Sequence, residues 1–226
     1  MKKGKLIVID GTDGCGKATQ TKQLVERLKG EGRRVFMLDF PRYGQRSAAL
    51  VEDYLNGKFG TAEQVGPYRA SIFYAVDRFA ASEEIRNRLN DGQIGISNRY
   101  VSANMGHQSG KIKDLAERDM FLAWLEDLEF VKFGIPRPDQ QVILYADPEV
   151  AQKLVDNKGH RDYVGGQKRD IHEADINHLG DAANAFLYCA EKFNWMVVNC
   201  SPNRSMRIPE DIGDEVYRSV ISTLNS

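Results

Sequence analysis

The sequence predicts an α/β fold, with a doubly wound parallel sheet of five strands and helices on both faces. Two observations support this prediction. Short apolar runs without polar alternation recur along the chain, as in strands that are buried on both faces. Segments with helical periodicity separate these runs, which favours right-handed helical crossovers between parallel strands. The predicted strands are residues 6–9, 35–38, 94–96, 142–144 and 196–198.

The predicted helices are recognised by apolar residues that recur three or four positions apart. They cover residues 24–28, 72–80, 124–131, 176–190 and 212–220. In the segment that starts at Trp124, apolar residues recur at i, i+1, i+4 and i+7, so we predict an amphipathic helix there. This helix should stop near Gly134, because Pro136 and Pro138 follow it.

Composition indicates a single globular domain over residues 1–226. Hydrophobic residues make up 42% of the chain and charged residues 28%, which are ordinary values for a globular enzyme. The net charge of −1 predicts no broad nucleic-acid or membrane surface, and no apolar run approaches a membrane span. Cys15, Cys189 and Cys200 are too few for a disulfide framework or a metal knuckle and fit a reducing cytoplasm.

The most informative motif follows the first predicted strand directly. It reads Gly11-Thr12-Asp13-Gly14-Cys15-Gly16-Lys17-Ala18-Thr19. The motif matches the phosphate-binding loop G-x-x-x-x-G-K-[ST] except at its last position, where Ala18 replaces the hydroxyl residue. Glycines let backbone N–H groups turn toward phosphate oxygens, the helix N-terminus adds a positive dipole end, and Lys17 adds a charge. The chain is therefore predicted to bind a nucleoside triphosphate, as a fold of the P-loop NTPase type.

Polar clusters follow three of the predicted strands. They are the phosphate loop, residues 40–43 and residues 98–100. Because ligands of open α/β sheets bind beyond the carboxyl ends of the strands, we expect the three clusters to meet in one crevice.

The segment at about residues 157–170 breaks the alternation of strands and helices, since it is polar, basic and contains glycine. Two interpretations are open. It is either a solvated surface loop or a lid whose cations reach the transferring phosphoryl group. The phosphate loop in the same chain favours the lid.

Taken together, these motifs resemble those of the thymidylate kinase family, P-loop nucleoside monophosphate kinases that phosphorylate dTMP. The resemblance runs over nearly the whole chain and is carried, in order, by Phe40-Pro41-Arg42-Tyr43-Gly44, Asp77-Arg78, Asn98-Arg99-Tyr100 with Ser102 and Asn104, and Asp170-Ile171-His172-Glu173. It implies ATP as the phosphoryl donor, dTMP as the acceptor, Mg²⁺ as cofactor, and a cytoplasmic homodimer.

The resemblance also implies roles for individual residues. The residues expected to bind ATP are Gly11, Thr12, Asp13, Gly14, Cys15, Gly16, Lys17, Ala18 and Thr19. Those expected to bind dTMP are Asp13, Phe40, Arg42, Tyr74, Arg78, Arg99, Asn104, His107 and Gln108. The expected catalytic groups are Asp13, Lys17 and Arg99 with Arg161 and Arg169 of the lid, where Lys168 is a further cation. Asp13 and Glu173, the latter through water, would position the metal.

Physical chemistry agrees with several of these roles. A fork-shaped guanidinium such as that of Arg99 suits a phosphate, and an aromatic face suits a flat base. In the resemblance Tyr74 would stack on thymine, Arg78 would hydrogen-bond the base and Arg99 would hold the acceptor phosphate. Phe73 is adjacent to Tyr74, so either of the two could be the stacking residue.

Three positions depart from the family pattern. Ala18 lacks a hydroxyl that usually binds Mg²⁺, and Asn98 stands where aspartate is usual, so we predict reduced metal affinity. His107 replaces a common tyrosine near the sugar 2′ position. Gly14 stands where one subgroup carries an arginine, so the basic lid suggests the other subgroup, which supplies its arginine from the lid.

Two alternative functions stay open. The first is another small P-loop kinase, which acts on a different nucleoside monophosphate or on a deoxynucleoside. Arg99 favours an acceptor that already carries a phosphate, and Asn98 removes one candidate base for a sugar hydroxyl. The second alternative is a nucleotide-binding protein that has lost catalysis.

Overall fold

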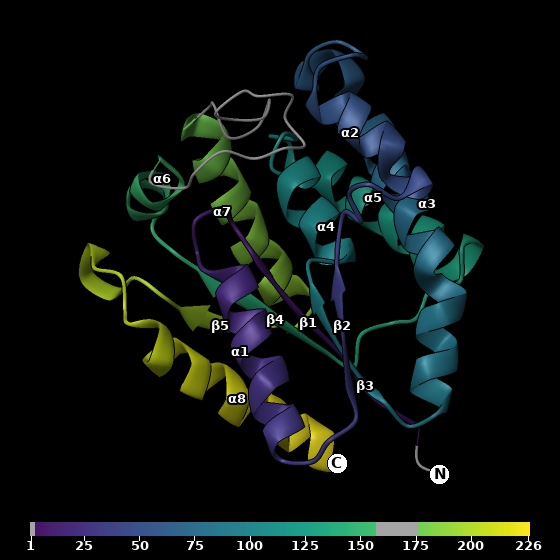
Figure 1. Ribbon diagram of the computed structural model, residues 1–226. Coiled ribbons are helices and arrows are strands. Elements are labelled where there is room, and N and C mark those ends of the chain that lie inside the picture. Colours follow the sequence, from purple (N-terminus) through teal and green to yellow (C-terminus); the bar gives the residue numbers. More distant parts are fainter. Residues whose placement is uncertain (1–2, 157–175) are drawn as a thin grey trace.

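The computed structural model of the protein describes residues 3–156 and 176–226 (Figure 1). The four predicted site residues Arg161, Lys168, Arg169 and Glu173 lie outside the described residues, so their roles stay predictions.

The sheet has five strands, all parallel, in the order β2-β3-β1-β4-β5. The strands are β1 (Leu6–Gly11), β2 (Val35–Asp39), β3 (Ile94–Asn98), β4 (Gln140–Tyr145) and β5 (Met196–Asn199). Every predicted apolar run falls inside one of them. All six residues of the central β1 are buried, which explains why its sequence shows no alternation.

Helices cover both faces of this sheet (Figure 1). They are α1 (Lys17–Gly30), α2 (Ala49–Leu55), α3 (Ala62–Asn90), α4 (Val101–Ser109), α5 (Leu115–Glu126), α6 (Pro148–Asp156), α7 (Ile176–Lys192) and α8 (Pro209–Asn225). Three single turns complete the described part: η1 (Arg46–Ala48), the π-helical η2 (Asp127–Lys132) and η4 (Pro202–Arg204). The predicted doubly wound architecture is confirmed.

Two apolar cores lie between the helices and the sheet. One contains side chains of α1 and α8 against Ile7 and Ile9 of β1. The other contains side chains of α3, α4, α5 and α7 against Leu6 and Val8. Alternate residues of one strand therefore serve the two faces, as the pleat requires.

The predicted helix over residues 124–131 is corrected by the structure. Regular helix ends at Glu126 and continues as the π-helical turn η2. Val131, which the periodicity placed on the buried face, is 64% exposed, whereas Leu125 is fully buried. The wider turn changes the register and places Glu129 in the interior, where it binds Arg78.

No helix of residues 3–156 and 176–226 is long and apolar enough to cross a membrane.

Candidate active site

The phosphate loop connects β1 to α1 and has the backbone that its glycines predict. Gly14 and Gly16 have φ values of 84° and 91°, in the region that residues with a Cβ rarely adopt. A Cβ at Gly14 would also collide with the backbone of Ala151. The loop therefore needs glycine at these positions, and Gly16 forms the N-cap of α1.

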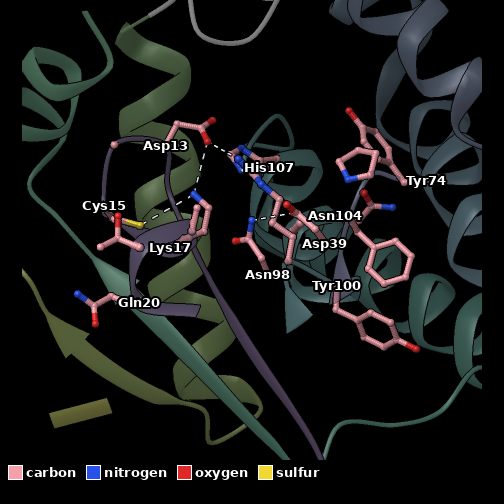
Figure 2. A pocket seen from close by; sticks show the side chains of 18 of the residues that line it. Asp13, Cys15, Lys17, Gln20, Asp39, Tyr74, Asn98, Tyr100, Asn104 and His107 are labelled. Carbon is pink, nitrogen blue, oxygen red and sulfur yellow. Dashed lines mark hydrogen bonds and ion pairs between the residues drawn. The ribbon is translucent and has the colours of Figure 1, made fainter. Parts of the chain in front are cut away.

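A cavity of about 720 Å³ extends from this loop across the carboxyl edge of the sheet (Figure 2). It brings together most of the predicted site residues: Asp13, Gly14, Cys15, Gly16, Lys17, Ala18, Thr19, Phe40, Tyr74, Arg78, Arg99, Asn104, His107 and Gln108. Gly11, Thr12 and Arg42 do not line it. The expected single crevice is therefore present.

Lys17 is buried, and contacts with phosphate-loop residues orient its side chain. Its Nζ donates a hydrogen bond of 2.7 Å to the carbonyl of Thr12 and lies 3.4 Å from an Asp13 oxygen. The side chain is only 7% exposed. The ammonium group is thus held within the loop, beside the cavity in which a phosphate would bind.

Arg99 connects the loop to the opposite wall of the cavity. Its guanidinium donates to the carboxylate of Asp13 and lies 3.0 Å from Nε2 of His107. Burial lowers the pKa of Arg99, but the carboxylates of Asp13 and Asp10 outweigh burial and hold the pKa above its usual value. The backbone φ of 64° at Arg99 is unusual for a residue with a side chain and favours a functional constraint there.

Asp10 is a buried carboxylate that the sequence analysis did not single out. It accepts hydrogen bonds from Ser102 Oγ at 2.6 Å and from the Gly11 N–H at 2.9 Å. Burial raises its pKa above the ordinary value, although the charges of Arg99 and Lys17 oppose this shift. The available signal was a charged residue at the penultimate position of an otherwise apolar strand.

Asp39 is a second missed carboxylate, and it lines the cavity beside Asn98. Asn98 Nδ2 donates a hydrogen bond of 2.8 Å to Asp39 Oδ1. Burial raises the pKa of Asp39, against the hydrogen bond from Asn98 and the charges of Arg99 and Lys17. The signal in the sequence was again a charge at the last position of a strand.

Arg42 is bound to Asp77 rather than directed into the cavity. Its Nε lies 3.0 Å from Asp77 Oδ1, and its backbone N–H donates to Asp77 Oδ2 at 2.8 Å. Asp77 is only 1% exposed, so its buried charge needs this partner. Contact of Arg42 with dTMP stays a prediction that these bonds do not favour.

Arg78 lines the cavity but is bound within the protein. Its Nε lies 3.1 Å from both carboxylate oxygens of Glu129, and its Nη1 donates to the carbonyl of Tyr100 at 3.2 Å. Arg78 and Glu129 are both at most 2% exposed. Sequence analysis missed Glu129, because nothing in the local pattern marks an acid that is turned inward by a π-helical turn.

The two candidate stacking residues face different surroundings. Tyr74 lines the cavity, whereas Phe73 packs against Tyr54 and Phe59 with ring centroids 5.9 and 5.2 Å apart. The structure therefore favours Tyr74 as the residue that could stack on a base.

Asn104 and Gln108 present opposite hydrogen-bonding groups to the cavity. Asn104 Nδ2 donates to the carbonyl of Ser71 at 3.1 Å, so its oxygen is left for a ligand. Gln108 Oε1 accepts from Lys111 Nζ at 2.7 Å, so its NH₂ group is left for a ligand. The partners fix both amide orientations, because a carbonyl only accepts and an ammonium only donates.

The cavity suits a hydrated cation rather than a metal cage. The described residues contain no group of three or more His, Cys, Asp or Glu that could hold a metal ion. Carboxylates of Asp13 and Asp39 line the cavity, and the buried Oδ1 of Asn98 has no hydrogen-bond partner in the described part of the chain. Oxygen groups of this kind fit Mg²⁺, which keeps several waters and binds through few protein ligands.

The fold and the cavity define a class of protein: an α/β protein with a phosphate-binding loop that opens into a second pocket with an aromatic wall. A family model described as "Thymidylate kinase" matches residues 9–202. The chain belongs to the thymidylate kinase family.

Individual relatives agree with this assignment. A thymidylate kinase of Mycobacterium tuberculosis (strain H37Rv) is 33% identical over 171 residues, which cover 75% of this chain and 78% of that protein. The human thymidylate kinase is 26% identical over 166 residues, covering 73% and 71%. The structure of a thymidylate kinase from Candida albicans has a TM-score of 0.73 at 20% identity, covers 97% of this chain and 92% of its own, and shares the fold.

Proposed function

We propose that this protein transfers the γ-phosphoryl group of ATP to dTMP and releases ADP and dTDP. Membership of the thymidylate kinase family supports this activity. The observation that carries it is the Arg99–Asp13 contact, which lies between the phosphate loop and the pocket with Tyr74. Donor and acceptor sites then share one cavity, as phosphoryl transfer requires.

The donor half consists of the phosphate loop and Lys17. Loop N–H groups and the start of α1 would bind the phosphates of ATP, and Lys17 would stabilise charge on the transferring group. Bound Mg²⁺ would neutralise phosphate charge between the two substrates. Asp13, which lines the cavity, would orient its waters, and Glu173 is proposed to do so from outside the described residues.

The acceptor half would recognise the base by stacking and by hydrogen bonds from two side-chain amides. Tyr74 would stack on the ring, while Asn104 presents an oxygen and Gln108 presents an NH₂ group. We propose that Asn104 accepts from N3–H of thymine and Gln108 donates to a ring carbonyl; in this placement cytosine would set its N3 acceptor against the Asn104 oxygen. Arg99 would bind the acceptor phosphate with its fork of N–H donors. The pocket thus favours a thymine or uracil monophosphate.

A coupled assay of ADP release across nucleosides and nucleoside monophosphates tests the proposal. We expect ADP release with dTMP and none above background with thymidine or dCMP. Release with another monophosphate or with a nucleoside alone would instead support a different small P-loop kinase. Nucleotide binding without release for any acceptor would support a protein that has lost catalysis.

We also propose a cytoplasmic homodimer. Large apolar side chains are exposed on α3, α5 and η2, namely Ile72, Phe79, Leu115, Met120 and Val131. The proposal takes these side chains to form one contact face, because contiguous exposed apolar surface often marks protein contacts. Light scattering during size exclusion should give twice the mass of one chain, and cell fractionation tests the location.

A further inference from the structure

We propose that Asp39, at the end of β2, supplies a further carboxylate, beside Asp13, that orients the metal hydrate between the two substrates, in partnership with the amide of Asn98. The inference rests on the proposed phosphoryl transfer. It assigns to β2 a charge that is missing from the end of β3, where Asn98 stands.

The sheet places these two residues side by side. β2 and β3 are neighbouring parallel strands, and Asp39 is the register partner of Asn98. Both line the cavity at the carboxyl edge of the sheet, where Figure 2 draws them between Lys17 and Tyr74. A group bound there would be in reach of donor and acceptor together.

The hydrogen bonds of the pair leave two oxygens for a ligand. Asn98 Nδ2 uses Asp39 Oδ1, and within the described residues Asp39 Oδ2 accepts no hydrogen bond. Asn98 is 8% exposed, and its buried Oδ1 has no partner within the same residues. A buried polar atom without a partner is costly, so a ligand that donates hydrogen bonds or coordinates oxygen would relieve this cost.

The charges around the pair favour a cation. Lys17 and Arg99 make their ion pairs with Asp13, and within the described part of the chain no ion pair involves Asp39. Asp39 is thus the cavity carboxylate whose charge is left for a ligand. Hydrated Mg²⁺ matches it, because this ion takes oxygen groups and keeps its waters.

The amide at position 98 is the natural partner for an acid at position 39. Two carboxylates 2.8 Å apart cannot both ionise easily, so one acid and one amide give a single stable charge. Either order of the two residues would supply this charge at the same edge of the sheet. The Mg²⁺ dependence is therefore the readout that separates a metal role from a structural one, because the exchanged pair also keeps the hydrogen bond.

The experiment compares Asp39→Asn, Asn98→Asp and the double variant that exchanges the two residues. Isothermal titration would measure binding of a non-hydrolysable ATP analogue, with dTMP present, as a function of Mg²⁺; initial rates would give kcat and KM. We expect Asp39→Asn to raise the half-saturating Mg²⁺ concentration about 10-fold in both measurements, the usual effect of removing a group that orients metal ligands. The exchanged variant should recover most of the loss. Asp127→Asn, a 49% exposed site, is the control.

Two results would overturn the inference. One is an exchanged variant no better than Asp39→Asn, with native circular dichroism in both. The other is an Asp39→Asn variant with unchanged Mg²⁺ dependence and a raised KM for dTMP, which would place Asp39 on the acceptor sugar. If the proposed function is wrong, the wild-type protein will release no ADP with dTMP. The binding titration would still measure the Mg²⁺ dependence, so the two failures can be distinguished.

Discussion

At the scale of single residues, the buried Lys17 is the cation of the phosphate loop that we propose binds the transferring phosphate. Its Nζ is bonded to the loop carbonyl of Thr12 and to Asp13. We expect Lys17→Ala to fold normally and to lower kcat by a factor on the order of 10²–10³, the usual loss for one contact to a transition-state charge. Lys22→Ala, on the same helix at a 73% exposed site, should leave the rate unchanged. Wild-type turnover in a natively folded Lys17→Ala protein would reject the assignment.

Lys111 carries a second, partly buried ammonium group, which donates a hydrogen bond to Gln108 of the base pocket. Burial lowers its pKa to about 8, from an ordinary value of 10.5. Between these values the unfolded chain binds a proton that the folded chain does not, so this residue makes the free energy of unfolding rise with pH over that window. The free energy of unfolding of the wild type minus that of Lys111→Met should therefore increase as the pH rises across this window.

Urea titrations at a series of pH values measure this difference. Other titrating groups cancel between the two proteins, so the slope isolates Lys111. Lys113→Met is the control, because Lys113 is a nearby lysine that is 71% exposed. A difference that stays constant with pH would show that Lys111 titrates normally and is solvated.

At the scale of elements, the Arg78–Glu129 pair joins α3 to η2 across a buried interface. Neither side chain is more than 2% exposed. We expect Glu129→Ala to lower the free energy of unfolding by about 3–5 kcal/mol, since it leaves a buried guanidinium without its counter-charge. The double change Arg78→Met with Glu129→Leu should cost less, because no charge is left unpaired.

Urea denaturation compares these variants with Glu84→Ala, a 62% exposed site on α3 that should change stability little. If Glu129→Ala and Glu84→Ala unfold alike, the pair contributes little and the register of η2 must have another cause.

The basic segment at about residues 157–170 is an element whose role rests on sequence alone. We expect Arg161→Ala or Arg169→Ala to lower kcat more than it raises KM, because a lid arginine would bind the transition state better than the ground state. Rates at saturating ATP and dTMP provide the measurement. If both variants keep full kcat, the segment is a solvated loop and the catalytic cation lies elsewhere.

Elements differ in how far the sequence predicts them. The five strands were predictable, because burial on both faces leaves uninterrupted apolar runs such as the one in β1. The helix over residues 124–131 was not, because the π-helical turn depends on the long-range contact of Glu129 with Arg78. The phosphate loop could be predicted, because its residues are contiguous in the sequence and their types alone define the motif. The partners of Arg42 and Asn98 could not be predicted. The course of α3 brings Asp77 to Arg42, and the register of β2 and β3 brings Asp39 to Asn98.

At the scale of the whole molecule, the topology gathers four segments that are distant in sequence at one edge of the sheet. The phosphate loop follows β1, Asp39 ends β2, Tyr74 comes from α3, and Arg99 and His107 follow β3. Because these segments pack into different apolar clusters, a ligand that contacts all of them should resist unfolding of the entire domain.

This arrangement predicts how substrates stabilise the protein. A ligand at about 100 times its Kd should raise the free energy of unfolding by about 2.7 kcal/mol. We expect dTMP and a non-hydrolysable ATP analogue each to do so, and dCMP at the same concentration to do less, because Asn104 and Gln108 oppose its base. Thermal and urea unfolding with each nucleotide measure the effect.

Arg99→Lys should reduce the stabilisation by dTMP and leave most of the stabilisation by the ATP analogue, because lysine lacks the forked guanidinium that would bind the acceptor phosphate. Equal stabilisation by dTMP and dCMP would show that the pocket reads only the phosphate and sugar.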